Sequence, residues 1–161
     1  MNTTPSCRTL ALIMVTVACC LSFSGCDGDY SVPITSRPTR KIDQQLLGNW
    51  VSQDGADKIK IRRFDDSSAI VSYNGDLARA FHSDIGESSF ISLQDIDSAD
   101  RKYIYLTYNV SDDGKRLNLR VVNTKVIPKE TKDSVIVQKL LKKNLHNSEL
   151  FGDKGEFVKD K

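Results

Sequence analysis

Cysteine, histidine and tryptophan are scarce in this sequence, and their scarcity argues against several classes of protein. The 161 residues include four cysteines, two histidines and one tryptophan. Three of the cysteines precede residue 21, and Cys26 is the only one in the rest of the chain. A disulfide framework needs pairs of cysteines, and a zinc site needs several cysteine, histidine or carboxylate ligands. We therefore expect no disulfide scaffold, no metal site and no cofactor.

An excess of charge of one sign is also missing. The chain carries 23 Lys and Arg against 21 Asp and Glu, and only one of these charged residues, Arg8, precedes residue 26. A protein that binds nucleic acid needs a clustered basic face, because phosphate neutralisation supplies most of its affinity. The near-neutral balance therefore predicts that nucleic acid is not a partner.

Long hydrophobic runs are limited to one, Leu10–Phe23, which follows Arg8. Its length suits a secretory signal and is shorter than the roughly 20 residues of a membrane-spanning helix. It ends in Phe23-Ser24-Gly25-Cys26, which resembles the lipobox of bacterial lipoproteins. The resemblance implies that residues 1–25 are removed and that Cys26 becomes lipidated. The alternative is an ordinary signal peptide cut elsewhere, with Cys26 a free thiol; the absence of any later cysteine favours the lipid anchor.

The resemblance to lipoproteins also implies a location and a partner. The lipid at Cys26 would hold the protein to a membrane of the bacterial cell envelope. Asp27, which follows directly, is similar to the signal that retains enterobacterial lipoproteins in the inner membrane. In a Gram-negative cell we therefore expect the periplasmic face of the inner membrane, with the outer membrane as the alternative.

The segment after the cysteine has the composition of a linker. Residues 27–42 contain Gly, Ser, Thr, Pro33 and Pro38 and show no usable hydrophobic period. Such a composition is typical of a flexible tether. We therefore expect a signal peptide over residues 1–25, a lipidated cysteine and tether over 26–45, and one domain over 46–161.

Short strands separated by turn signals fill most of this domain. Tyr103–Val110 is the most strand-like segment because it is rich in aromatic and β-branched residues. Asn74-Gly75 is a strong signal for a two-residue hairpin turn. The other predicted strands are Leu47–Ser52, Lys58–Phe64, Ala69–Tyr73, Leu77–His82, Ser89–Ile96, Arg116–Val126 and a short last strand around Phe157 that follows Gly152–Gly155.

One helix is predicted, over Thr131–Asn144, where Val137, Leu141 and Leu145 recur at helical spacing. The order of elements predicts a mainly β fold. About seven or eight antiparallel strands form a meander, and closure into a small barrel leaves few exposed edges. The amphipathic helix comes late in the chain and packs on the sheet. Its lysines, Lys139–Lys143, are interpreted as a solvated face, with anionic lipid headgroups as the other reading.

Two features resemble lipocalins and small bacterial lipocalin-like lipoproteins. Gly48-Asn49-Trp50 is similar to the G-x-W opening of lipocalins, in which the tryptophan plugs one end of an eight-stranded barrel. The tail over residues 126–159 is similar to that of the lipoproteins: a helix, a turn and a last strand that ends in a basic residue, here Lys159. The resemblance implies a lipocalin-like barrel over 46–161, with Trp50 as the barrel plug.

Catalytic groups are not arranged in any recognised motif. In a strand, His82 and Asp84 share one face and Ser83 points away, whereas a catalytic triad must converge. His82 is therefore interpreted as an edge-strand residue and His146 as a solvent-facing helix end. The acidic pairs at 65–66, 95–97 and 112–113 are interpreted as turn residues. We expect no enzyme activity and no catalytic residue.

Two functions are compatible with a non-catalytic barrel of this kind. In the favoured one, large inward side chains fill the barrel, and its outer face contacts another envelope protein. In the alternative, the barrel is a lipocalin-like module that encloses a small apolar or amphipathic ligand. Four tyrosines have a different place in each function. In a ligand-binding barrel they line the cavity, and in a filled barrel they divide between the core and the outer surface. They are Tyr73, Tyr103, Tyr105 and Tyr108.

Overall fold

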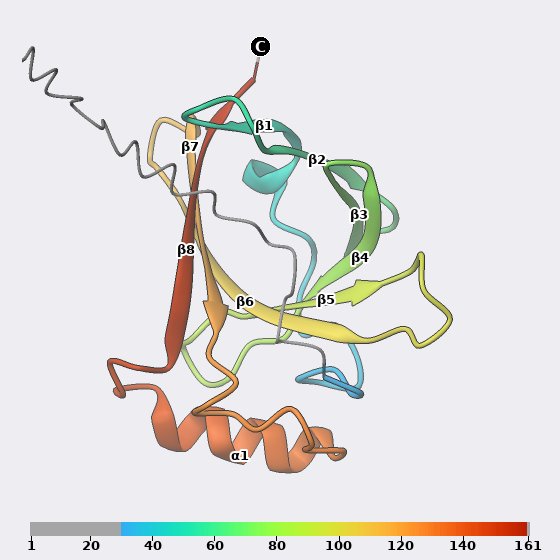
Figure 1. Cartoon of the computed structure of the whole chain (residues 1–161), viewed down its shortest axis with the longest axis vertical. Helices are drawn as coiled ribbons and strands as arrows, with labels where there is room; N and C mark the ends of the chain where they lie inside the picture. Colours follow the sequence, from blue (N-terminus) through green and yellow to red (C-terminus); the bar gives the residue numbers. More distant parts are fainter. Residues whose placement is uncertain (1–29, 161) are drawn as a thin grey trace, which may run out of the picture.

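Eight antiparallel strands form a closed barrel in the computed structural model, which describes residues 30–160. The strands follow one another in chain order, and the last pairs with the first to close the sheet (Figure 1). Their bounds are β1 (Gly48–Ser52), β2 (Lys58–Arg63), β3 (Ser68–Tyr73), β4 (Asp76–His82), β5 (Ile91–Asp95), β6 (Tyr103–Val110), β7 (Arg116–Val122) and β8 (Phe151–Lys159). The prediction of a mainly β fold with an antiparallel barrel is confirmed.

Local chemistry explains the turn between β3 and β4. Asn74 and Gly75 both have positive φ angles, 50° and 114°. A two-residue hairpin turn that matches the twist of the strands requires this conformation, and Asn and Gly adopt it at least cost. Asp76 then starts the return strand opposite Tyr73.

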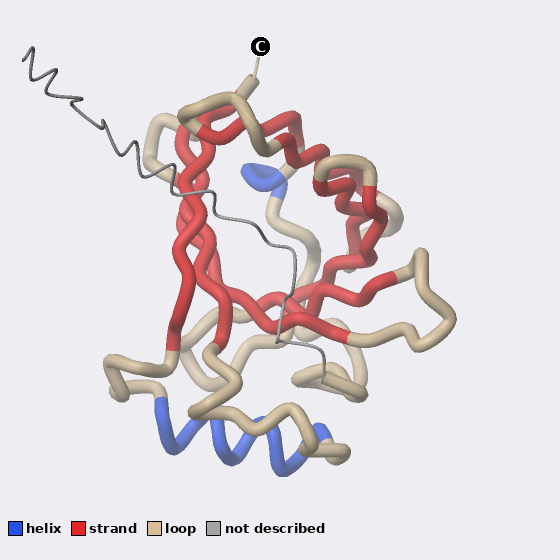
Figure 2. The backbone as a smooth tube through the Cα atoms, in the orientation of Figure 1, coloured by secondary structure: helices blue, strands red, loops and turns tan. Residues whose placement is uncertain are grey.

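Two short helical segments complete the fold. The 3₁₀ helix η1 (Gln44–Leu46) precedes β1, and the α-helix α1 (Ser134–Asn144) lies between β7 and β8 (Figure 2). The helix α1 begins where it does because Asp133 caps it: its carboxylate accepts a hydrogen bond of 2.7 Å from the amide of Val135. The predicted late helix is thus confirmed, and it starts three residues later than Thr131. The expected signal helix over residues 1–25 lies outside the described residues.

The last strand differs from its prediction. Gly152–Gly155 belongs to β8, because Gly155 pairs with Leu119 and Lys154 with Arg120. The glycines suggest a turn, but pairing with β7 holds this stretch extended. The strand β7 ends at Val122, four residues earlier than predicted.

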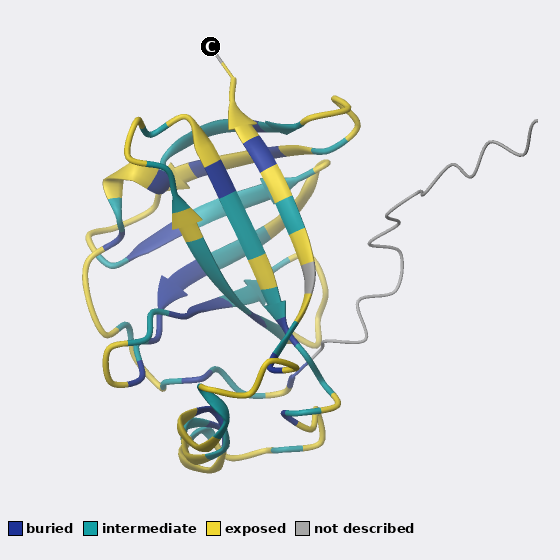
Figure 3. Cartoon of the chain, turned by 90° about the vertical axis from the view of Figure 1, so that its left-hand side faces the viewer, coloured by how far each residue is buried: buried dark blue, intermediate teal, exposed yellow. Residues whose placement is uncertain are grey.

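Alternation along the strands produces an inner and an outer set of side chains (Figure 3). One buried cluster lies inside the barrel and includes Trp50, Ile59 and Phe157. The other lies outside the barrel wall, between the sheet and α1. It consists of Tyr30, Ile34, Ile85, Phe90, Tyr105, Val122, Ile127, Val137, Leu141 and Leu150.

The expectation of a flexible tether over residues 26–45 is wrong for residues 30–45. Tyr30 and Ile34 are fully buried in the outer cluster, and Tyr30 exchanges two backbone hydrogen bonds of 2.8 Å with Tyr103. The ring of Tyr30 also stacks on that of Tyr105, with centroids 3.9 Å apart. This segment is therefore part of the folded domain, which starts earlier than the predicted residue 46.

The helices of the described region are both short. Neither one, over residues 30–160, combines the length and the apolar character that crossing a membrane requires.

Candidate binding cavity

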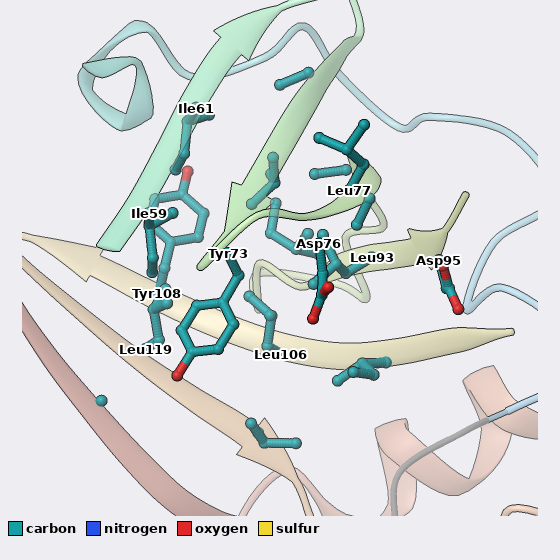
Figure 4. Close-up of a pocket in the computed structure, with 18 of the residues that line it drawn as sticks. Ile59, Ile61, Tyr73, Asp76, Leu77, Leu93, Asp95, Leu106, Tyr108 and Leu119 are labelled. Atoms are coloured by element: carbon teal, nitrogen blue, oxygen red, sulfur yellow. The ribbon is translucent and has the colours of Figure 1, made fainter. Parts of the chain in front are cut away.

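The barrel is hollow, and its interior holds a cavity of about 890 Å³. Figure 4 shows side chains from several strands pointing into this space. Most of the lining is apolar, and the aliphatic contributors come from nearly every strand. They are Ile42, Leu46, Ile59, Ile61, Ala69, Val71, Leu77, Ala78, Ala80, Ile91, Leu93, Ile104, Leu106, Leu119 and Val121.

Small residues at inward positions leave this space empty. Ala69, Ala78 and Ala80 face the interior from two neighbouring strands. An eight-stranded barrel is just wide enough for large side chains to fill it, and methyl groups at several inward positions leave room for a ligand. The expectation that large side chains fill the barrel is therefore wrong.

One end of the cavity is closed by the segment that leads into β1. Ile42 and Leu46 line the cavity there and are almost fully buried. Trp50 belongs to the same buried cluster, is 1% exposed, and donates a hydrogen bond of 2.8 Å from Nε1 to the carbonyl of Leu46. This bond satisfies the polar atom of the indole and ties η1 to β1.

A polar network lies beside this closed end and links three segments. The hydroxyl of Tyr108 donates to Asp43 Oδ2 at 2.9 Å and accepts from Arg40 Nη2 at 3.2 Å. Arg40 also forms an ion pair of 3.2 Å with Asp84 and donates to Ser89 Oγ at 2.6 Å. Burial, together with the neighbouring Asp43 carboxylate, raises the pKa of Tyr108. The network fastens residues 40–43 to the β4–β5 loop and to β6.

The other end of the cavity opens between hairpin turns and is acidic. Asp57, Asp76, Asp95 and Asp97 contribute to the lining there, together with one cation, Lys102. The Lys102 ammonium lies 3.6 Å from the carboxylate of Asp100. In Figure 4, Asp76 and Asp95 lie on the opposite side of the cavity from Ile59 and Ile61. The cavity thus combines an apolar interior with a negatively charged mouth.

The His82-Ser83-Asp84 stretch does not form a catalytic triad. Ser89 Oγ donates to Asp84 Oδ1 at 2.8 Å and lies 3.5 Å from His82 Nδ1. Ser83 points to the other side of the strand, where it contacts Ser92 Oγ at 2.9 Å. The alternation of a strand predicts this separation.

The interpretation of His82 as an edge-strand residue is wrong. The strand β4 pairs on both sides in the closed barrel, and His82 is fully buried at its end. No polar group of residues 30–160 is a hydrogen-bond partner of its Nε2. Burial, with a contribution from the charge of Arg40, lowers the pKa of His82 to about 4. A buried imidazole in this state is neutral at physiological pH.

The acidic pairs lie at turns, as the sequence predicts, and Asp95 is at the same time the last residue of β5. Asp65 Oδ1 accepts from the amides of Ser67 and Ser68, each at 2.8 Å, and hydrogen bonds from Ser68 and Ser67 lower the pKa of Asp65 to about 2. Asp95 and Asp113 accept from backbone amides in the same way. Across residues 30–160, no three histidine, cysteine or acidic side chains are grouped so that they could hold a metal ion.

The two residues singled out at the N-terminus, Cys26 and Asp27, lie outside the described residues. The tyrosines divide between two environments. Tyr73 and Tyr108 line the cavity, whereas Tyr105 is fully buried outside the barrel wall in the cluster against which Tyr103 packs. Alternation around the strand of Tyr103–Val110 separates odd from even positions, but it does not say which face is hollow.

Sequence reasoning missed most of the cavity residues because their chemistry is ordinary. Aliphatic side chains at alternating positions are typical of any barrel core, and only the alanines at 69, 78 and 80 signalled spare volume. Comparison of the chain with protein-family models, with curated proteins and with solved structures gives no match.

Proposed function

We propose that this chain is a lipid-anchored binding protein whose barrel holds a small apolar or amphipathic ligand. The observation that carries this proposal is the cavity of about 890 Å³ with its mostly aliphatic lining. Ligand sites in proteins are commonly clefts or cavities of about 300–1,000 Å³, lined by apolar side chains with a few polar groups at set positions. The cavity falls within this range.

The distribution of polar groups supports an amphipathic ligand. Ile59, Ile61 and Leu119 line the inner part of the cavity, whereas charged side chains are confined to the mouth. Burying apolar surface there gains about 25 cal/mol per Å², and an unpaired charge would be costly in the same place. The ligand therefore places its apolar portion inside and its polar end at the mouth.

The sequence favours a structural or interaction role because large inward side chains are expected to fill the barrel. The hollow interior removes that reason. Catalysis is not proposed: among the described residues, those that line the cavity include one serine, Ser98, and no histidine or cysteine. The closed end resembles that of a lipocalin barrel, with Gly48 and Trp50 on β1 and Lys159 on β8. This likeness supports Trp50 as the plug of the closed end.

The lipid anchor is the second part of the proposal, and it depends on the sequence around Cys26. A Cys26→Ser substitution removes the thiol to which the lipid would attach. Anchoring predicts that the native protein fractionates with membranes at a mass raised by its acyl chains, and that the variant does neither. A variant that stays in the membrane at unchanged mass contradicts the anchor. Asp27 supports the periplasmic face of the inner membrane in a Gram-negative cell.

Titration with a neutral fluorescent probe, N-phenyl-1-naphthylamine, tests the binding function. The proposal predicts saturable binding of one probe per chain, with the rise in emission that accompanies transfer into an apolar site. It also predicts that lipids extracted from the membranes with which the native protein fractionates displace the probe. Fluorescence that rises without saturation contradicts a defined cavity site.

A further inference from the structure

The outward face of α1 combines exposed aliphatic side chains with lysines. Val135 is 55% exposed and Ile136 is 48% exposed, whereas Val137 and Leu141 on the opposite side of the helix are fully buried. Four lysines share the exposed side. They are Lys132, just before the helix, and Lys139, Lys142 and Lys143. At 100° per residue, the five of these positions that lie within α1 occupy an arc of roughly 120°.

No acidic side chain of residues 30–160 forms an ion pair with these lysines. The nearest acid in the chain, Asp133, is engaged as the cap of the helix through the amide of Val135. The face is therefore both apolar and uniformly positive, which is the pattern of helices that lie on anionic membrane surfaces.

The N-terminal segment is fixed directly against this helix. Ser134 Oγ donates to the carbonyl of Pro33 at 2.7 Å, and Gln138 Nε2 donates to the carbonyl of Ile34 at 3.0 Å. Tyr30 OH donates to the carbonyl of Ile127 at 2.9 Å. Cys26 precedes Tyr30 by four residues, which span at most about 14 Å. A lipid on Cys26 therefore keeps Tyr30 within about 14 Å of the headgroups. Pro33 and Ile34, in the same segment, hold α1 on that side of the domain.

We propose that the exposed face of α1 lies on the anionic phospholipid surface of the membrane that holds the anchor. In this arrangement Val135 and Ile136 enter the headgroup region, and the four lysines lie near lipid phosphates. This inference rests on the lipid anchor of the proposed function, and it adds a defined orientation. The anchor at Cys26 and the face of α1 form two points of contact, which together fix which side of the barrel faces the membrane.

The test uses the lipidated protein reconstituted in vesicles, with an environment-sensitive fluorophore at one introduced cysteine. An Ile136→Cys variant reports from the exposed face of α1. The matched control is Val158→Cys, a partly exposed position near the end of β8, which lies at the opposite end of the molecule from α1 (Figure 1). Vesicles contain phosphatidylcholine alone or phosphatidylcholine with about 30% phosphatidylglycerol.

With anionic vesicles we expect at least a twofold rise in emission and a blue shift at residue 136, and no change at residue 158. The signal should fall at high salt. It should also disappear when Lys132, Lys139, Lys142 and Lys143 are all replaced by Gln. A label at residue 136 that stays in a water-like environment on both vesicles overturns the inference, as does an equal response at residue 158. A response that depends on protein concentration indicates contact between copies and also overturns it.

Failure of the anchor is distinguishable from failure of this inference. Flotation with pure phosphatidylcholine vesicles measures the anchor alone, because those vesicles offer no net charge to the lysines. Protein that does not float there contradicts the anchor and, with it, the inference. Protein that floats but gives no signal at residue 136 on anionic vesicles contradicts the inference only.

Discussion

The ammonium group of Lys159 lies 5.0 Å from the ring centroid of Trp50, directly across the seam where the barrel closes. The stem of Lys159 also leaves no room for a side chain at residue 48, because a Cβ there would lie only 2.9 Å from Lys159 Cε. Gly48 also has a φ of 145°, which favours glycine. The first and last strands thus meet through a glycine, an indole and a lysine at the closed end of the cavity.

Truncation of Trp50 should therefore open the closed end. We expect Trp50→Ala to lower the free energy of unfolding by about 3–5 kcal/mol, because it removes a fully buried ring and the hydrogen bond to Leu46. Lys159→Met keeps the stem and removes the charge, and it should cost only about 0.5–1 kcal/mol. Urea denaturation followed by circular dichroism measures both. A loss below about 1 kcal/mol for Trp50→Ala contradicts its place in the core.

The N-terminal segment should contribute strongly to stability. Tyr30→Ala removes the buried ring that stacks on Tyr105, and we expect a loss of about 3 kcal/mol or more in the free energy of unfolding. Tyr30→Phe keeps the ring and removes only the hydrogen bond to Ile127, which predicts a loss of about 1 kcal/mol. If Tyr30→Ala is as stable as the unaltered protein, residues 30–45 behave as a tether after all.

Acid should destabilise the fold through His82. Its pKa is about 4 in the folded protein against 6.5 for an ordinary histidine. Between these values the unfolded chain binds a proton that the folded protein does not bind. Stability is therefore full above about pH 6.5 and falls as the pH drops toward 4, by up to about 3 kcal/mol from this residue.

A His82→Gln variant isolates this contribution, because it keeps a polar side chain that does not titrate. Unfolding free energies measured from pH 7.5 to 4 should fall less steeply for the variant than for the unaltered protein. The comparison uses the slopes, so a constant loss of stability in the variant does not affect it. Equal slopes in the two proteins would contradict a neutral buried imidazole.

The acidic mouth should bias the choice of ligand. Dodecylamine and dodecanoic acid carry the same chain with opposite charges, and we expect the amine to displace a bound neutral probe at a lower concentration. Asp76→Asn should narrow this difference by about two- to fivefold, the size expected for an exposed charge pair. Asp112→Asn, in the β6–β7 turn, changes the net charge equally and serves as the control. Equal displacement by the amine and the acid would show that the mouth charges play no role.

The fold was largely predictable because alternation and turn chemistry are local signals. Tyr103–Val110 is a strand because its side chains favour a pleated surface, and Asn74-Gly75 turns because both residues accept positive φ. Pairing of β7 with β8 across a long connection is not local. For this reason the sequence predicts a turn at Gly152–Gly155, whereas the structure places this stretch within β8.

The cavity and the position of the N-terminal segment could be predicted only in part. Alternation divides the residues of each strand between two faces, but it does not say which face is inward. Whether the inward side chains fill the barrel depends on its radius after closure, which no local pattern states. Ala69, Ala78 and Ala80 were the available signal. Similarly, Tyr30, Val32 and Ile34 alternate with Ser31 and Pro33, but three apolar positions are too short a pattern to outweigh the composition of a linker. The burial of this segment depends on long-range contacts with Tyr103 and Tyr105, which no local pattern states.

A pair of tryptophan variants on β3 tests the central claim, that the hollow interior binds the ligand, most directly. Val71 lines the cavity, whereas its neighbour Ser72 is not among the lining residues and alternates to the other face. Titration with N-phenyl-1-naphthylamine should show at least a tenfold weaker affinity for Val71→Trp, because the indole occupies the binding space, and an unchanged affinity for Ser72→Trp. Equal affinity in both variants, with both shown to be folded by circular dichroism, would contradict a ligand site inside the barrel.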